Sequence, residues 1–295
     1  MPTATPASTR SRSCCPEPDR RTLTVVIDGT NLTTGLAVQA NGSAVSGLVV
    51  ENVTGTGISV TGNNNVVRGN YVGVNDTGTT AAGNSTGVDV YGTGNWVGGP
   101  NPADRNVISG NQGDGVAVDG TDNHVAGNRI GTTADGTAAL PNLDGVAVYG
   151  TGTHVGGTAP GGGNVISGNT YNGIYLSTGA DGTVVQGNLV GTNAAATAPL
   201  ANGTGLLVHS NNNQIGGTAA GAANVLSGNA DDGVRIEALA SGNTLQDNLI
   251  GVTPGPIPLG NGRYGVWLSS SNLNTVGGAG AGNTIGSNTS DGVYV

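Results

Sequence analysis

A four-residue pattern recurs through almost the whole chain: a glycine, an aliphatic residue, any residue, and a second aliphatic residue. The pattern begins at Gly35, Gly57, Gly87, Gly115, Gly145, Gly173, Gly205, Gly233, Gly265 and Gly292. From Gly57 onward successive copies lie about 27–32 residues apart, a period that is typical of stacked structural repeats. Because the period crosses every place where a domain boundary could be drawn, we expect one elongated domain over residues 22–295.

Each repeat contains three short segments with the pattern of a β-strand. In the first, aliphatic residues such as Val116 and Val118 alternate with outward positions, which indicates a strand with one buried face. The second reads Asn or Thr, variable, aliphatic, as in Asn95-Trp96-Val97. The third segment alternates between two sequence patterns: Gly-Asn-x-Val/Ile-Gly, as at Asn70, and Asn-Val-Ile/Leu-Ser-Gly-Asn, as at Asn106. The full repeat therefore spans two coils. Three buried strand faces per turn predict a triangular prism in which asparagine side chains stack and bond along the axis.

The segment Asn106–Asn111 followed by Asp114-Gly115-Val116, with copies at Asn164 and Asn224, resembles the repeats of pectate-lyase-like right-handed parallel β-helix proteins, especially large secreted bacterial surface proteins. The resemblance covers about residues 24–295. It implies an all-β, single-stranded, right-handed parallel β-helix, a solenoid of about ten coils that alternate between about 28 and about 30 residues in length. It also implies an extracellular or cell-surface location. It selects no activity, because that superfamily holds lyases, hydrolases, epimerases and adhesin-like chains.

The two ends of the sequence differ from the repeats. Residues 1–21 are rich in Pro, Ser, Thr and Arg and contain no long apolar run, so we expect a disordered tail there. At the other end, Val295 falls in the middle of a coil, where an apolar stack would face solvent. We therefore expect the β-helix to be truncated at its C-terminal end. Alternatively, a partner covers this end, by end-to-end or lateral self-association.

Charge narrows the classes of partner. Four of the nine arginines and two of the eighteen acidic side chains lie within positions 1–21, which leaves five arginines against sixteen acidic side chains in the body. Phosphate backbones and anionic membranes require clustered cations. We therefore expect no nucleic-acid partner and no membrane insertion, and favour a polysaccharide or a surface protein as partner.

The outward positions of the first strand carry the most varied side chains. Four of the seven tyrosines and one of the two tryptophans lie there. Aromatic rings along a flat ladder suit sugar rings, whose apolar faces stack on them. Outward strand positions also favour aromatic residues through β-propensity alone, and this alternative stays open. The ligand-binding candidates are Tyr91, Tyr149, Tyr175, Arg235 and Trp267.

Two pairs of residues on this face are candidates for catalysis. Asp89 and Asp119 fall on neighbouring coils, offset by two positions, with an expected Cα separation on the order of 8 Å, which is compatible with an inverting glycosidase pair. His209 and Glu237 are direct neighbours between coils and suit an acid–base pair. The structural alternatives are a solvated face for the aspartates and a surface ion pair for His209 and Glu237.

Other aspartates precede the strand glycine, Asp114 and Asp144 among them, and the sequence assigns them to turn chemistry. His124 and His154 occupy equivalent positions next to Trp96, but the row offers no third metal ligand. We therefore expect no metal site and no cofactor, with Ca²⁺ at the recurring Asp-containing loops left open.

The loops vary only slightly in length, which favours binding over a deep catalytic cleft. The sequence thus predicts a non-catalytic extracellular β-helix module that presents a ladder face to a glycan or a protein. The alternatives are a polysaccharide hydrolase, lyase or epimerase that uses the same face, and a structural spacer.

Overall fold

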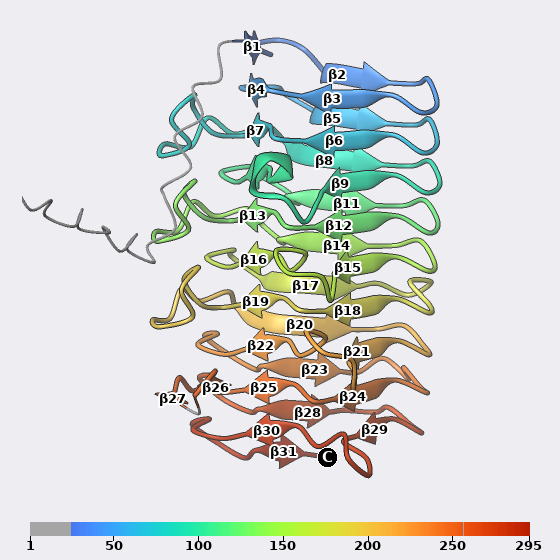
Figure 1. The fold of residues 1–295 in the computed structure, drawn as a ribbon, viewed down its shortest axis with the longest axis vertical. Helices are drawn as coiled ribbons and strands as arrows, with labels where there is room; N and C mark the ends of the chain where they lie inside the picture. The colour runs from blue at the N-terminus through green and yellow to red at the C-terminus, as the bar shows by residue number, and fades with distance from the viewer. Residues whose placement is uncertain (1–24, 256) are drawn as a thin grey trace, which may run out of the picture.

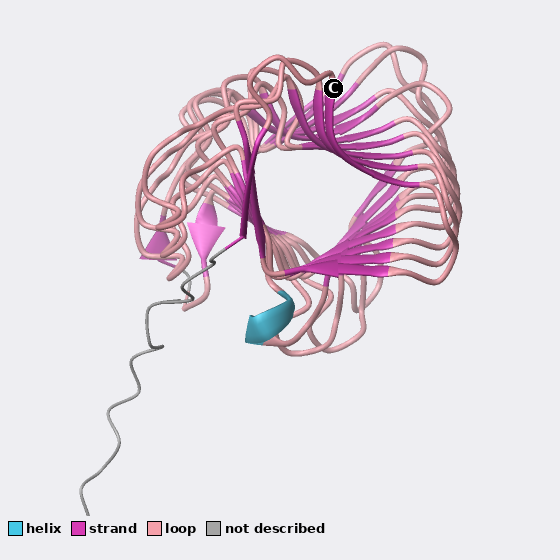
Figure 2. Cartoon of the chain, turned by 90° about the horizontal axis from the view of Figure 1, so that it is seen from above, coloured by secondary structure: helices cyan, strands magenta, loops and turns pink. Residues whose placement is uncertain are grey.

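The computed structural model describes residues 25–255 and 257–295. The predicted tail, residues 1–21, lies outside the described residues. Three long parallel sheets form the three sides of a prism, and successive coils stack along its axis (Figures 1 and 2). The described residues thus form a parallel β-helix, as the period predicts.

The strands of the first sheet, in spatial order, are β1 (Val25–Asp28), β4 (Leu48–Glu51), β7 (Tyr71–Val72), β10 (Val107–Ile108), β13 (Arg129–Ile130), β16 (Val165–Ile166), β19 (Leu189–Val190), β22 (Val225–Leu226), β25 (Leu249–Ile250) and β30 (Thr284–Ile285). Those of the second sheet are β2 (Thr34–Val38), β5 (Thr56–Val60), β8 (Thr86–Val90), β11 (Val116–Val118), β14 (Val146–Val148), β17 (Asn172–Leu176), β20 (Thr204–Val208), β23 (Val234–Ile236), β28 (Val266–Leu268) and β31 (Val293–Tyr294). Those of the third sheet are β3 (Ala44–Ser46), β6 (Val66–Arg68), β9 (Trp96–Gly98), β12 (His124–Ala126), β15 (His154–Gly156), β18 (Val184–Gln186), β21 (Gln214–Gly216), β24 (Thr244–Gln246) and β29 (Thr275–Val276).

Equivalent residues of successive coils pair directly with one another. Val88, Val116 and Val146 are consecutive register partners in the second sheet, which confirms the predicted stacking. The coils do not keep strictly to two alternating lengths, however. The coil that joins Leu36 to its partner Ile58 is shorter than either expected length, because its turns are shorter, and the coil that joins Ile174 to Leu206 is longer than either.

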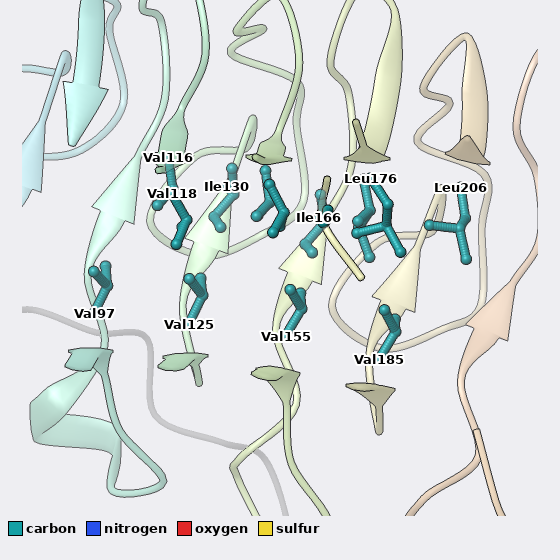
Figure 3. Close-up of a cluster of buried hydrophobic side chains, with 14 of the residues drawn as sticks. Val97, Val116, Val118, Val125, Ile130, Val155, Ile166, Leu176, Val185 and Leu206 are labelled. Carbon is teal, nitrogen blue, oxygen red and sulfur yellow. The ribbon is translucent and has the colours of Figure 1, made fainter. Parts of the chain in front are cut away.

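The main core is a column of aliphatic side chains inside the prism, and a second, smaller cluster forms around first-sheet strands and the loops that follow them: Val49, Tyr71, Val74, Val107 and Ala134. Val97, Val125, Val155 and Val185 of the third sheet point towards residues of the other two sheets, such as Ile130 (Figure 3). All of them are almost completely buried. Each buried aliphatic side chain contributes about 1.5–3 kcal/mol of hydrophobic free energy, so a narrow core suffices when every coil repeats it.

The recurring glycine of the sequence pattern is required by packing. A Cβ at Gly115 would lie 2.7 Å from the carbonyl oxygen of Gly145 and 2.8 Å from Nδ2 of Asn142. The positive φ angles belong instead to other glycines, such as Gly73, Gly131 and Gly191, at the turns after the first-sheet strands. The pattern glycines therefore mark where neighbouring coils approach most closely.

Asparagine side chains form three ladders along the stack. In one ladder, Nδ2 of Asn106 donates to Oδ1 of Asn128 at 2.9 Å, and Nδ2 of Asn128 donates to Oδ1 of Asn164 at 3.1 Å. A second ladder runs through Asn84, Asn111, Asn142, Asn169, Asn202, Asn229, Asn261 and Asn288. The third runs through Asn95 and Asn123 and, further along, Asn213, Asn243 and Asn274. These amides satisfy buried backbone groups at the corners, where no strand is present to do so.

The two-coil repeat of the sequence shows itself in the loops. Short antiparallel excursions follow every second strand of the first sheet, closed by the bridges Val74–Ala81, Thr132–Ala139 and Thr192–Pro199. The strands β26 (Val252–Thr253) and β27 (Ile257–Pro258) form the next one. These excursions project from one edge of the rod (Figure 1). On another corner, a 3-10 helix covers Pro102–Asp104. Among the described residues, no helix is long and apolar enough to cross a membrane.

Candidate functional site

The outward-facing side chains of the second sheet form what we call the ladder face: Asp89, Tyr91, Asp119, Tyr149, Tyr175, His209, Arg235, Glu237, Trp267 and their neighbours. Asp89, Ala117, Ala147 and Tyr175 are successive register partners. Leu207, Arg235, Trp267 and Tyr294 continue the row. The structure therefore places four of the predicted candidates in one row along the rod: Asp89, Tyr175, Arg235 and Trp267. The other five stand two positions further along the chain and form a second, parallel row: Tyr91, Asp119, Tyr149, His209 and Glu237.

One end of the ladder face is an acidic cluster around Asp89. The Tyr91 hydroxyl donates a hydrogen bond of 2.6 Å to Oδ2 of Asp89, and Asp89 is only 8% exposed. The alternative of a solvated aspartate is therefore wrong for Asp89, because Tyr91 packs beside it. Burial raises the pKa of Asp89, and the neighbouring Asp119 carboxylate adds to the rise. In turn, the bond to Asp89 raises the pKa of Tyr91 to about 12.

Two aspartates that the sequence assigns to turn chemistry belong to the same cluster. Burial raises the pKa of Asp114 to about 6, and Asp144, Asp89 and Asp119 contribute further repulsion. The Tyr149 hydroxyl lies 3.4 Å from Oδ2 of Asp114. The pKa of Asp144 is also raised by burial. Both aspartates stand one position before a pattern glycine, just ahead of strands β11 and β14. This shared position is their only signal in the sequence, and it does not show that they lie near Asp89 and Asp119.

Aromatic rings form the middle of the ladder face. Tyr149 and Tyr175 meet edge to face with centroids 6.4 Å apart, and Tyr175 meets His209 in the same way at 5.3 Å. Nε2 of His209 lies 3.0 Å from Oε1 of Glu237, so the predicted pairing of these residues is present. The Tyr175 hydroxyl lies 3.3 Å from Nδ1 of His209. Contacts with neighbours on both sides thus hold the imidazole in one orientation.

The other end of the ladder face is an arginine–aromatic cluster. Arg235 and Arg263 both bind Asp232, whose side chain is fully buried. Burial alone would raise the pKa of Asp232, but hydrogen bonds from Arg263 and Arg235 outweigh it, so the pKa lies below its ordinary value. The guanidinium groups of Arg235 and Arg263 also lie 4.6 and 4.5 Å from the centroid of the Trp267 ring. Arg235 therefore binds Asp231 and Asp232 and lies over the Trp267 ring.

Comparison with known proteins identifies the family. The family model described as "Right handed beta helix region" matches residues 86–278, well over half of the chain. The chain belongs to the right-handed β-helix family. No curated protein matches the chain in sequence.

Two solved structures are similar to this β-helix. The crystal structure of the Dettilon tailspike protein superimposes with a TM-score of 0.51 and 16% identity, over 88% of this chain and 54% of the tailspike. Pectate lyase Pel9A gives a TM-score of 0.35 and 18% identity, over 76% of this chain and 55% of the lyase. The β-helix thus spans about half the length of the tailspike, and that similarity concerns the fold alone.

The third sheet of the β-helix carries a separate aromatic stack. The Trp96 and His124 rings lie 4.1 Å apart and nearly parallel, with an angle of 9°. The His124 and His154 rings follow at 4.8 Å and 21°. Burial lowers the pKa of His124, and repulsion from His154 lowers it further. Within residues 25–255 and 257–295, no group of three or more histidine, cysteine or acidic side chains is arranged to hold a metal ion.

Proposed function

We propose that this β-helix is a non-catalytic extracellular module that binds a glycan along the ladder face. The observation that carries the proposal is the unbroken run of rings from Tyr149 through Tyr175 to His209, each held by its neighbour. Rings fixed before binding lose little conformational entropy when a ligand stacks on them. Side chains with both donors and acceptors flank the run, which suits sugar hydroxyls.

The charge of the face favours a neutral glycan over an acidic one. Asp89, Asp114, Asp119 and Asp144 gather at one end, and an acidic polymer would be repelled by them. At the other end, the positive charges of Arg235 and Arg263 are neutralised by Asp231 and Asp232. Hydroxyl groups of a neutral sugar can bond to carboxylates and to guanidinium groups without a charge penalty.

The test is retention on immobilised neutral polysaccharides. The double variant Tyr149→Ala and Trp267→Ala should lose at least about tenfold in retention, corresponding to roughly 1.4 kcal/mol for two truncated aromatic side chains. The control is Leu239→Ala, which removes an apolar side chain that is 72% exposed in the turn after strand β23. Unchanged retention of the double variant would refute binding through these rings.

Hydrolysis of the bound glycan is the second candidate, and the pKa of Asp114 is the observation that favours it. With a pKa raised to about 6, Asp114 keeps part of its proton near neutral pH and can act as a general acid. Asp114 would protonate the glycosidic oxygen as its bond to the sugar breaks, while a second carboxylate of the cluster takes a proton from the attacking water. We assign the role of that base to Asp119, whose charge contributes to the raised pKa of Asp114, because Asp89 is buried beneath Tyr91.

Product release separates the two candidates. If the cluster hydrolyses a glycan, the protein will release new reducing ends from neutral polysaccharides, and Asp114→Asn will lower the rate by at least about a hundredfold. Retention on the same polysaccharides should survive this substitution. Retention without any product would leave the binding module alone as the function.

A further inference from the structure

The Trp96 stack on the third sheet ends in a pocket. Trp96, on β9, has His124 of the next coil as one register partner and Val66 of the preceding coil as the other. His124 covers one face of the indole at 4.1 Å. A pocket of about 270 Å³ lies on the Val66 side, lined by Val66, Arg68, Trp96, Gly98, Gly99, Pro100 and Asp104. The stack of rings thus stops at Trp96 because the small Val66 occupies the next position.

The rim of this pocket carries a built polar pair. Nη1 of Arg68 donates to Oδ1 of Asp104 at 3.0 Å, and Asn101 Nδ2 donates to Oδ2 of the same carboxylate at 2.7 Å. Asp104 is 8% exposed, whereas the Arg68 side chain is 49% exposed. Gly99 permits this arrangement, because a Cβ there would lie 2.9 Å from Cβ of Asp104. The 3-10 helix Pro102–Asp104 fixes the carboxylate against the pocket.

We propose that this pocket binds one pyranose ring of a neutral glycan, stacked on Trp96 in the place that a further ring of the ladder would take. The apolar face of the sugar would lie on the indole, which is 38% exposed. Its hydroxyls would meet the guanidinium donors of Arg68 and the acceptors of Asp104. An anionic ligand fits less well, because the Arg68 guanidinium at the rim is already paired with Asp104.

This site is distinct from the ladder face. Trp96 lies on the third sheet, and the ladder face is the outer side of the second sheet. The pocket therefore does not depend on the proposed function. If both sites bind, a single rod would hold glycan chains on two of its three sides.

The experiment uses the fluorescence of Trp96 alone. The chain has two tryptophans, so a Trp267→Phe protein reports only on Trp96. We expect saturable quenching or a blue shift with at least one of methyl β-glucoside, methyl β-galactoside and methyl α-mannoside, tested up to about 50 mM because one-ring contacts give millimolar dissociation constants. Quenching by these glycosides leaves ladder-face binding unmeasured, so failure here is separate from failure of retention on polysaccharides.

Two matched valine substitutions decide whether the pocket is the site. Val66→Phe places a ring against Trp96 and fills the pocket, so it should weaken binding at least about tenfold. Val184→Phe makes the same change beyond His154, at the opposite end of the stack, and should leave binding unchanged. Arg68→Gln, which removes the charged donor but keeps the fold, should weaken binding several-fold.

The proposal is overturned if none of the three glycosides gives a saturable change. It is also overturned if Val66→Phe and Arg68→Gln both bind as tightly as the parent. If Val66→Phe does not fold, as judged by its circular dichroism, Arg68→Gln alone decides the outcome.

Discussion

The Tyr91 hydroxyl donates a 2.6 Å hydrogen bond to the carboxylate of Asp89, which stands two positions earlier, on strand β8. This bond lowers the pKa of Asp89, but burial and the neighbouring Asp119 outweigh it. On the ladder face, the pKa of the Asp89 carboxyl and the pKa of the Tyr91 hydroxyl above it are therefore both raised.

Replacing Tyr91 by Phe keeps the ring over Asp89 and removes only the hydroxyl. Because the lost bond stabilised the ionised carboxylate, the pKa of Asp89 should rise further above its ordinary value. Stability at neutral pH should fall by about 1 kcal/mol. The side-chain carboxyl carbon of Asp89, followed by NMR through a pH titration, gives the first quantity. An unchanged or lower midpoint would contradict the hydrogen bond.

Asp114 should make the protein more stable as pH falls below neutral. Its pKa is about 6 in the folded chain and near the ordinary value of 3.8 when unfolded, so the folded state binds the proton first. The resulting penalty is complete above pH 6 and disappears as pH falls from 6 to 3.8. Asp114→Asn should therefore be more stable than the parent at pH 7, by about 1 kcal/mol after allowance for solvent screening, and this advantage should vanish near pH 4. Denaturant midpoints of both proteins at several pH values measure it. A constant difference across this range would contradict the raised pKa.

His124 should act in the opposite direction. Its folded pKa lies below the ordinary value of 6.5, so the unfolded chain binds the proton first and the folded state loses stability as pH falls through 6.5 to the lower folded value. His154→Gln removes one of the two causes, so the pKa of His124 should move back towards 6.5. NMR titration of the imidazole protons of His124 in both proteins tests this. Identical midpoints would show that the stacked rings do not repel one another.

The asparagine ladders should carry much of the stability of the corners. Asn128→Ala removes the acceptor of the Asn106 backbone N–H and of its Nδ2, and also the donor to the Val97 carbonyl. Since these groups are buried, we expect a loss of about 2–4 kcal/mol in the free energy of unfolding. Asn63→Ala is the matched control, because Oδ1 of Asn63 accepts a backbone bond from Thr93 at an exposed position. Its cost should be below about 1 kcal/mol. Equal losses in the two variants would show that burial does not set the value of a ladder amide.

The repeat pattern was enough to predict the fold, because each coil has aliphatic residues at the same positions of its strands. Residues such as Val88, Val116 and Val146 stand at equivalent positions, and only direct stacking buries all of them. The same reasoning placed His209 beside Glu237. Column order along a parallel sheet follows from spacing alone.

Burial on the outer face could not be predicted in this way. The side chains of Asp89 and Ala147 point away from the core and are nevertheless buried. Large side chains on the same face, such as Tyr91 and Tyr149, shield them from solvent. The place of Asp114 in the acidic cluster could not be predicted for a related reason. Its position before a pattern glycine indicates a turn, and its electrostatic interaction with Asp89 depends on the backbone path ahead of the strand. The pairing of Arg235 depends on Asp232 and Arg263, residues from two loops whose paths no strand pattern specifies.

The asparagine amides give the rod a direction. In all three ladders the Nδ2 group donates towards the coil that comes later in the chain, as from Asn70 to Asn106 and from Asn84 to Asn111. The side-chain dipoles of each ladder therefore add head to tail, and the two directions along the rod are not equivalent. A further coil can continue the ladders only in the same orientation as the existing coils. This holds both for a coil of the same chain and for a coil of a second molecule, so such a stack would extend with one fixed polarity.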